Sequence, residues 1–405
     1  MKKVILLLHV KRWVPLLIIM LFSSILTGTA SAGTSKKLPD PDWTFFVPEE
    51  HSYMSDSNVR ITDQALHFMS IDNQMFNLDK KTGKLLSKTS YTAGSNMSFN
   101  FFGTYAQTAP NGTVYILTPV KNRSGIEKQR LTAYHANGKV LWTKYFDEKI
   151  RSMSGVSVMP NGNLFIYLET ASERVTSYRY SPEGKFLGKN NWDASIYNGF
   201  VNGLLQTINS TSKTSSRMKF YDFNMRQQFQ YNFDFKEGVF SGFGSDGLLH
   251  FQKNLDNNVT SFTAKTTSGK VIWSRKINDV SYYQDSTTSV AVSKRVFSNG
   301  FTGIRSNGSF FMIDGKGVMQ TVPASAQTYQ TAGDGTVMLV EDSKISIYQT
   351  TASASVQIKL LHTVDITELS SSDPMFVYEG GGIVYVMTDN SKISRLNLNK
   401  LPKST

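Results

Sequence analysis

The sequence predicts an all-β fold: a single β-propeller of seven to eight four-stranded blades, with eight favoured. A half-unit made of a Gly-containing turn and an alternating apolar run recurs about every 45 residues. Its copies begin at Thr62, Pro110, Pro160, Val201, Ser245, Ser298, Gly333 and Gly380. Short strands at this spacing are typical of propeller blades. The 26 Phe and 18 Tyr residues also favour strands, because aromatic side chains suit pleated, half-buried surfaces.

The second half of each unit predicts the outer hairpin of a blade. Segments such as "RLTAYHANGKVLW" and "VTSFTAKTTSGKVIW" alternate with the period of a strand on either side of a polar turn. We expect the turn glycines to adopt the left-handed conformation that a short hairpin requires. These glycines are Gly83, Gly138, Gly184 and Gly269.

A lysine follows each of these glycines: Lys84, Lys139, Lys185 and Lys270. A catalytic role was the alternative, but four equivalent lysines in four repeats favour solvent-facing residues that guard strand edges. Trp142, Trp192 and Trp273 are expected to pack between blades, since large aromatic residues in repeats usually serve packing rather than cofactor stacking.

The last copy of the repeat has room for only two strands before Leu398. The segment "WTFFV", Trp43–Val47, is predicted to add a strand to this last blade and close the ring, which removes the exposed edges of an open array. Seven blades remain an alternative, because the copy that begins at Ser298 is short and degraded.

The first 32 residues are predicted to be a signal peptide. Lys2, Lys3, Lys11 and Arg12 precede an apolar run that ends in "TASAG", and the run is shorter than the roughly 20 residues that span a bilayer. We therefore expect a signal peptide over 1–32, an N-terminal linker over 33–42, the propeller over 43–400 and a tail over 401–405. The expected location is outside the cell, secreted or bound to the wall, with the membrane contacted only through the signal peptide before cleavage.

Charge suggests a class of partner. Without residues 1–32 the chain keeps 39 Lys and Arg against 31 Asp and Glu, so it is attracted to anionic surfaces. The longer loops are predicted at 118–130, 209–219 and 349–359, and the first two are basic. Candidate binding residues in these loops are Lys121, Arg123, Lys128, Arg130, Lys213, Arg217 and Lys219. Disordered blade-tip loops are the alternative interpretation.

The repeat resembles that of the quinoprotein-type, PQQ-like β-propeller family. "AYHANGKVLW", "AKTTSGKVIW" and "NLDKKTGKLL" look like its pattern of Ala, a polar spacer, Thr-Gly-Lys, two apolar residues and Trp. The enzymes of that family use an adjacent cysteine pair, a calcium ion and an Asp base. This chain has no cysteine, so the resemblance implies the non-catalytic branch, with no cofactor and with PQQ and Ca²⁺ not expected.

The functional prediction is a monomeric, non-catalytic scaffold that binds a protein or an anionic cell-envelope polymer through blade-tip loops. No catalytic, cofactor or metal residue is assigned. A specific nucleic-acid partner is not expected, because the basic residues are scattered rather than in runs. The alternative is an enzyme, either a PQQ-dependent dehydrogenase or a glycan-processing propeller. His67 and His250, at equivalent strand positions, are expected to pack or bond to a neighbouring blade, or else to line a central channel.

Overall fold

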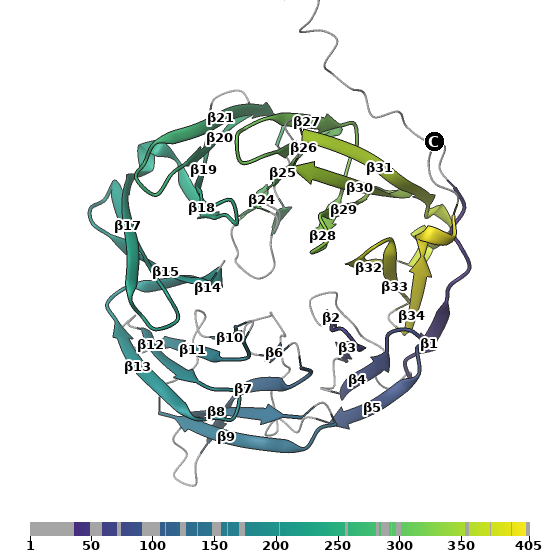
Figure 1. Ribbon diagram of the computed structural model, residues 1–405, viewed down its shortest axis with the longest axis horizontal. Helices are drawn as coiled ribbons and strands as arrows, with labels where there is room; N and C mark the ends of the chain where they lie inside the picture. Colours follow the sequence, from purple (N-terminus) through teal and green to yellow (C-terminus); the bar gives the residue numbers. More distant parts are fainter. Residues whose placement is uncertain are drawn as a thin grey trace, which may run out of the picture.

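The computed structural model describes most of the chain between Lys36 and Leu401. The described ranges are 36–48, 59–70, 74–90, 106–109, 111–121, 127–135, 137–147, 155–159, 161–169, 175–201, 203–255, 258–280, 283–284, 291–292, 294–296, 301–352, 356–372, 374–389 and 391–401. They form eight four-stranded antiparallel sheets arranged in a ring (Figure 1). The prediction of an all-β propeller with eight blades is confirmed, and the seven-blade alternative is wrong.

Blades 1 to 7 each consist of four strands that follow one another in the chain. Blade 1 comprises β2 (Val59–Ile61), β3 (Ala65–Met69), β4 (Gln74–Asp79) and β5 (Leu85–Ser90), and blade 2 comprises β6 (Ala106–Thr108), β7 (Val114–Lys121), β8 (Glu127–Tyr134) and β9 (Val140–Phe146). Blade 3 comprises β10 (Gly155–Val158), β11 (Leu164–Glu169), β12 (Val175–Tyr180) and β13 (Phe186–Trp192), and blade 4 comprises β14 (Ser195–Val201), β15 (Leu204–Ser210), β16 (Ser215–Tyr221) and β17 (Gln227–Asp234). Blade 5 comprises β18 (Val239–Phe243), β19 (Leu249–Asn254), β20 (Val259–Lys265) and β21 (Val271–Asn278), and blade 6 comprises β24 (Lys294–Val296), β25 (Thr302–Ser306), β26 (Ser309–Ile313) and β27 (Met319–Val322). Blade 7 comprises β28 (Thr328–Thr331), β29 (Thr336–Val340), β30 (Lys344–Ala352) and β31 (Val356–Asp365).

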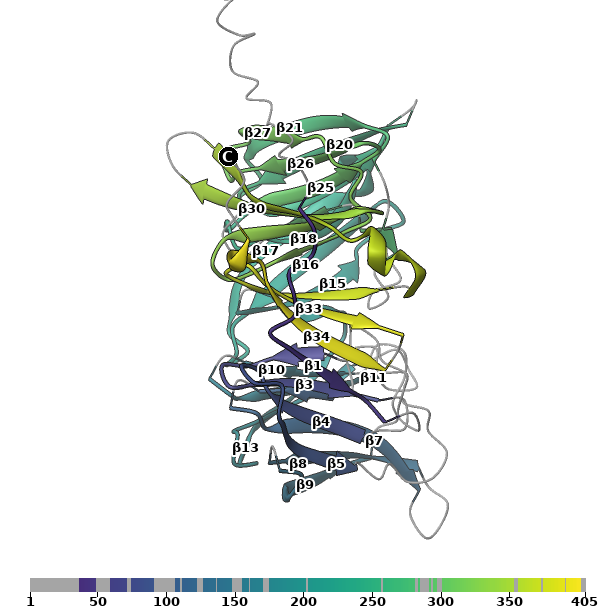
Figure 2. The ribbon, with the colours of Figure 1, turned by 90° about the vertical axis from the view of Figure 1, so that its right-hand side faces the viewer.

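Blade 8 joins the two ends of the propeller. Its strands β32 (Met375–Gly380), β33 (Ile383–Thr388) and β34 (Lys392–Asn397) are completed by β1 (Trp43–Phe46), which pairs with β34. Figure 2 shows β1 beside β34 on the outside of the ring. The expected closing strand at "WTFFV" is therefore confirmed, and the degraded copy at Ser298 belongs to a complete blade.

The remaining described elements lie in the connections between blades, except η5, which follows the last strand. They are a small sheet of β22 (Tyr283–Gln284) and β23 (Ala291–Val292), and the 3₁₀ turns η3 (Phe235–Glu237), η4 (Thr367–Ser372) and η5 (Leu398–Lys400). No helix among the described residues is long and apolar enough to cross a bilayer.

The strands form because their apolar residues alternate or fill both sides. In β20 buried and half-buried residues alternate along the whole strand, whereas all five residues of β29 are buried. A second strand with two buried faces is what a blade needs when it lies between two other blades. Each apolar cluster accordingly draws on neighbouring blades, such as Tyr115 and Ala133 of blade 2 with Leu164 and Ile166 of blade 3.

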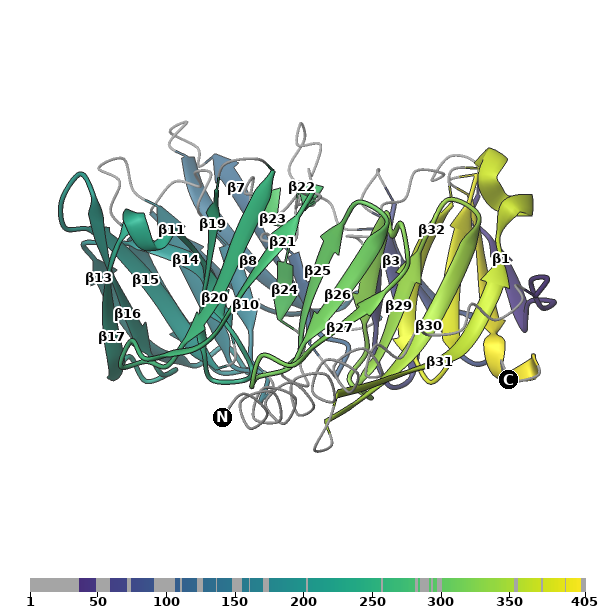
Figure 3. The same ribbon diagram turned by 90° about the horizontal axis from the view of Figure 1, so that it is seen from above.

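The antiparallel order gives the disc two different faces. Hairpins between first and second strands, and between third and fourth strands, lie on one face, which we call the turn face. Hairpins between second and third strands lie on the opposite face together with the connections between blades, and we call this the loop face. In Figure 3 the turn face is at the bottom and the loop face, with β22 and β23, is at the top.

Outer-strand side chains from one blade contact the turn glycines of the next. The structure places Gly83, Gly138, Gly184 and Gly269 at φ angles of +70°, +83°, +80° and +89°. A Cβ atom on Gly184 would lie 2.8 Å from the ring of Trp142 in the preceding blade. The Trp142 indole Nε1 also donates a hydrogen bond of 2.8 Å to the Pro182 carbonyl. Glycine is therefore needed at position 184 both for its backbone conformation and for the approach of the ring.

Of the other tryptophans that the structure describes, two make the same contact and one does not. Trp43 of blade 8 covers Gly83 of blade 1, and Trp273 of blade 5 covers Gly317 of blade 6. Trp192 lies at the other end of its outer strand, where Nε1 donates to Ser177 Oγ within its own blade and the ring meets Tyr221 of blade 4 edge-on. Trp142, Trp192 and Trp273 thus all contact the next blade, but Trp192 does so without a turn glycine.

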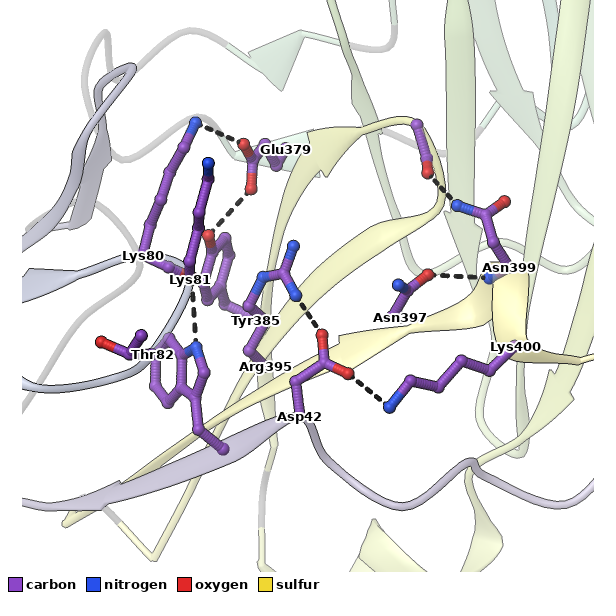
Figure 4. Close-up of polar contacts among 12 residues, drawn as sticks. Asp42, Lys80, Lys81, Thr82, Glu379, Tyr385, Arg395, Asn397, Asn399 and Lys400 are labelled. Carbon is purple, nitrogen blue, oxygen red and sulfur yellow. Dashed lines mark hydrogen bonds and ion pairs between the residues drawn. The ribbon is translucent and has the colours of Figure 1, made fainter.

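A polar network surrounds the closing strand (Figure 4). The Asp42 carboxylate, just before β1, is paired with Arg395 of β34 and lies 2.6 Å from Lys400 Nζ. Across the boundary between blades 8 and 1, Lys80 Nζ lies 2.7 Å from Glu379 Oε1. The Tyr385 hydroxyl donates to the other oxygen of Glu379 at 2.8 Å, and burial together with this carboxylate raises the pKa of Tyr385. The segment 36–42, expected to be a linker, therefore contacts the propeller through Asp42, and Lys36 also forms a backbone bridge to Val364.

The contact of Trp142 with Gly184 predicts a measurable penalty. Gly184→Ala should lower the free energy of unfolding by about 3 kcal/mol, because the left-handed backbone and the crowded indole both oppose a methyl group. Gly203→Ala is the matched control: its φ is +76° and a Cβ would meet no atom within 4 Å, so about 1 kcal/mol is expected. Urea denaturation measures both values, and equal losses would contradict the proposed packing.

Candidate binding site on the loop face

The innermost strands carry few ionisable side chains among those that the structure describes. Among the side chains described on these strands, Glu379 is the one acid or base, and it is paired with Lys80. The described side chains of the other inner strands are apolar, hydroxyl or amide, such as Gln107, Ser157 and Gln330. Across the described part of the chain no three His, Asp or Glu side chains gather where they could hold a metal ion.

His67 belongs to a buried hydrogen-bonded row in blade 1. Its Nδ1 lies 2.5 Å from Asn77 Oδ1, and the amide of Asn77 donates to Ser87 Oγ at 2.8 Å. Because this orientation leaves Asn77 Oδ1 as an acceptor, Nδ1 carries the proton of a neutral imidazole. Burial lowers the pKa of His67, and the hydrogen bond to Asn77 offsets only part of that effect.

His250 lies at the equivalent place in blade 5 with a different partner. Its Nε2 is 3.0 and 3.1 Å from the two carboxylate oxygens of Asp246, in the turn before β19. Both side chains are buried, and the imidazole also contacts the ring of Trp273. Both histidines therefore form these hydrogen bonds within their own blade, and both are buried in the packed sheets, as the packing alternative expected.

The basic loops predicted as binding sites are not brought together. Lys121, Lys128 and Arg130 lie on β7 and β8 of blade 2, whereas Lys213, Arg217 and Lys219 lie at or near the β15–β16 hairpin of blade 4. Blade 3 separates the two groups, although both hairpins are on the loop face. The loop predicted at 349–359 joins β30 to β31 and so lies on the turn face.

The blade 2 residues are only partly available to a ligand. Lys128 Nζ forms an ion pair of 2.7 Å with Asp147, and Arg130 is half-buried on β8. Arg123 and the side chain of Lys121 lie outside the described residues. The blade 4 hairpin is more open: Lys213 is exposed at its tip, and Arg217 is exposed while its Nε donates to Asn232 Oδ1 at 3.0 Å. Lys219 is half-buried.

Further exposed lysines lie near the blade 4 hairpin and form a basic patch with it. The hairpin meets the connection to blade 5 where Phe235 N donates to the Thr214 carbonyl at 2.8 Å. Exposed Lys236 follows in η3, and the next residue but one, Gly238, lies against the Cβ of exposed Lys253 on β19. In the sheet of blade 5, Lys253 and exposed Lys276 both pair with Ser261, so they share one row. The basic patch is Lys213, Arg217, Lys236, Lys253 and Lys276.

The acidic residues nearest to this patch already have partners. Asp234 caps η3 by accepting a hydrogen bond from Lys236 N at 2.8 Å. Glu237 is ion-paired with Lys265 and accepts a hydrogen bond from the Tyr231 hydroxyl. Burial by itself would raise the pKa of Glu237, but the hydrogen bonds from Lys265, the Asp234 backbone and Tyr231, together with the Lys265 charge, outweigh burial and lower that pKa. These contacts leave the lysines of the patch to face solvent.

A polar cavity of about 530 Å³ adjoins the patch, between blades 5 and 6. It is lined by Asn254, Leu255, Asn258, Val259, Thr260, Asp279, Val280 and Asn307. Asp279 N donates to the Asn258 carbonyl at 2.9 Å and Asn307 N donates to the Asp279 carbonyl at 3.0 Å, which ties the three loop-face connections together. Amide side chains both donate and accept hydrogen bonds, as hydroxyl-rich ligands require.

The sequence suggested Lys213 and Arg217 of this patch as candidate binding residues but gave no indication of Lys236, Lys253, Lys276 or the cavity. The missed lysines lie in "DFKEG", "HFQKN" and "WSRKIN", at the ends of strands or in a connection. The sequence indicated only that each of these lysines lies at the end of its repeat that belongs to the loop face. Which loop-face ends meet depends on the contact between two blades.

Comparisons with known proteins give distant structural likenesses. No family model matches the chain, and no curated protein matches it. Among solved structures, the computationally designed Ika8 protein is 9% identical, covers 87% of this chain and 98% of its own, and gives a TM-score of 0.44. A eukaryotic initiation factor is 12% identical, covers 91% of each chain and gives 0.47. BamB from Moraxella catarrhalis is 10% identical, covers 90% of this chain and 99% of its own, and gives 0.34.

The buried imidazole of His67 predicts a pH dependence. Since its pKa is lower in the folded than in the unfolded chain, the stability it contributes is complete above about pH 6.5 and is lost as the pH falls below that value. The loss for one such group is at most about 1.4 kcal/mol per pH unit. His67→Gln, which removes this proton, should therefore give a shallower fall in the free energy of unfolding between pH 7 and pH 5. Parallel slopes for the two proteins in urea denaturation would contradict the prediction.

Proposed function

We propose that this protein is an exported, non-catalytic binding scaffold that holds an anionic, hydroxyl-rich cell-envelope polymer on its loop face. The observation that carries the proposal is the basic patch, five exposed cationic side chains on blades 4 and 5, beside a cavity lined by amide groups. A polymer of this kind, with phosphate or carboxylate groups between sugar or polyol units, presents both kinds of group that the site complements.

The roles of the two parts follow from their chemistry. Lysine ammonium groups attract the anionic groups of the ligand over several ångströms, and the attraction weakens with salt. The amides of Asn254, Asn258 and Asn307 would bond hydroxyl groups at short range. Asp279 is the one carboxylate in the lining, so the anionic groups of the ligand belong on the patch and its hydroxyl groups in the cavity.

The proposal keeps three expectations from the sequence. It places the protein outside the cell, as the predicted signal peptide implies, and it treats the PQQ-like resemblance as a likeness of scaffold. It needs neither PQQ nor Ca²⁺. Rigid scaffolds commonly carry their binding residues on the loops that they position.

Binding of a wall teichoic acid, a phosphodiester-linked glycopolymer, should depend on the basic patch. The triple variant Lys213→Glu, Lys253→Glu and Lys276→Glu should bind it at least about tenfold more weakly and with a flatter salt dependence, because three attractive charges become repulsive. Titration by calorimetry at 50 and 200 mM salt measures both effects.

The matched control reverses three lysines on the turn face, Lys84, Lys139 and Lys185, and should leave polymer binding unchanged. Asn254→Asp together with Asn307→Asp changes amides in the cavity to carboxylates of nearly the same size and shape. This double variant should bind the anionic polymer several-fold more weakly. Equal losses in the loop-face and turn-face triple variants would show a non-specific charge effect and overturn the proposal.

A further inference from the structure

The outer rim of the turn face carries a unit that repeats in five blades. In four of them a turn lysine directly precedes two apolar residues, and in blade 6 the turn glycine stands between the lysine and the apolar pair. The apolar residues remain 38% to 56% exposed. The units are Lys84 with Leu85 and Leu86, Lys139 with Val140 and Leu141, Lys185 with Phe186 and Leu187, Lys270 with Val271 and Ile272, and Lys316 with Val318 and Met319. We call these five units the apolar–lysine rim.

Packing between blades does not account for these apolar pairs. In blades 2 and 5 the contact with the next blade is made by the residue after the pair, since Trp142 covers Gly184 and Trp273 covers Gly317. In blade 1 it is made by Thr89, which covers Gly138. Val140 and Leu141, which precede Trp142, stay about half-exposed. Isolated exposed apolar residues are ordinary, but adjacent pairs repeated around one rim form a surface of the kind that interaction sites use.

The acidic residues near the rim lie in its turns and not in its outer strands. The outer strands β5, β9, β13, β21 and β27 contain no Asp or Glu. The acidic residues of the adjoining turns accept hydrogen bonds within those turns. Asp79 accepts one from Thr82 N, Asp314 from Val318 N, and Glu183 from Ser181 Oγ. Within the described part of the chain, no ion pair or side-chain hydrogen bond engages the ammonium groups of the five turn lysines.

All five units lie at the same edge of the disc, the outer edge of the turn face. All of these hairpins join third to fourth strands, so they lie along the edge of the turn face, as the β20–β21 and β26–β27 hairpins do in Figure 3. Blades 1, 2 and 3 present three units side by side, and blades 5 and 6 present two more. Blade 4 interrupts the series with Arg226, Gln227 and Gln228.

We propose that the apolar–lysine rim docks the propeller on an anionic lipid bilayer. A lysine beside exposed apolar groups suits the boundary of a membrane, where the ammonium group meets lipid phosphates and the apolar pair enters the acyl region. A bilayer is flat and repeats its headgroups in every direction, so it can engage several units of one rim at once. The loop face, with its basic patch, then points away from the lipid.

This contact goes beyond the proposed polymer site and differs from the expectation that only the signal peptide meets the membrane. It uses other residues on the opposite face. Either proposal can therefore fail while the other stands.

The absence of cysteine from the chain allows a site-specific test. Protein that lacks residues 1–32 keeps every described contact, because the described residues begin at Lys36. Leu141→Cys carrying an NBD fluorophore should brighten and shift to shorter wavelength on vesicles of phosphatidylglycerol and phosphatidylcholine, but not on phosphatidylcholine alone. The same label at Lys213→Cys, on the loop face, is the matched control and should not respond.

Variants of the rim separate its two components. Val140→Ser, Leu141→Ser, Phe186→Ser and Leu187→Ser together should reduce vesicle flotation at least about tenfold. Lys84→Gln, Lys139→Gln and Lys185→Gln should weaken it by about fivefold per lysine and reduce its salt dependence. The changed side chains are exposed, so the urea midpoints should stay close to that of the parent, and teichoic acid binding should be unaffected.

Several results would overturn the membrane proposal. One is an unchanged NBD signal at residue 141 on anionic vesicles, which would exclude insertion. Another is flotation that survives the four serine substitutions. A third is a dimer in solution, seen by light scattering and abolished by those substitutions, which would assign the rim to a second copy of the chain instead of a bilayer.

Discussion

The pairing of β1 with β34 is the contact on which the rest of the structure depends. Every blade has two faces that are apolar, so a blade is stable only between two others, and a row of eight would leave its first and last faces exposed. The strand from the N-terminal end of the propeller completes the last blade and so joins residues more than 340 positions apart. The partly buried charges of Asp42, Arg395, Glu379 and Lys80 surround this joint. Asp42 is paired with Arg395 across the joint, and Lys80 with Glu379 across the boundary to blade 1. Partly buried charges need such partners to offset the cost of desolvation.

Closure also fixes how neighbouring blades meet. The tryptophan of one outer strand lies on the turn glycine of the next blade at three boundaries, and Thr89 and Tyr231 cover Gly138 and Gly269 in the same way. The repeat thus encodes both halves of the contact, a large side chain and a position with none. Because the contact is always made at the turn face, that edge of the disc is the most regular part of the molecule, whereas the loop face varies from blade to blade.

This difference between the faces explains why the two candidate surfaces have different character. The apolar–lysine rim comes from the repeat itself, and its units recur with the hairpins. The loop-face patch comes from residues that do not recur, and it exists because the β15–β16 hairpin, η3 and the end of β19 contact one another. A repeated rim suits an extended, uniform partner, and a unique patch beside a cavity suits a ligand with its own sequence of charges and hydroxyl groups.

The sequence by itself determined the class of fold and the closing strand and favoured eight blades over seven, because each rests on local patterns: a period, a turn glycine and a short apolar run. The structure decided for eight. It also indicated Lys213 and Arg217 as exposed cations. Only the tertiary structure decided that Lys128 is neutralised by Asp147, that blade 3 separates the two basic hairpins, and that Lys253 and Lys276 share a row near them. The physical reason is that a strand pattern is set by neighbours in the chain, whereas the surroundings of a surface charge are set by whichever loops the closed ring brings beside it.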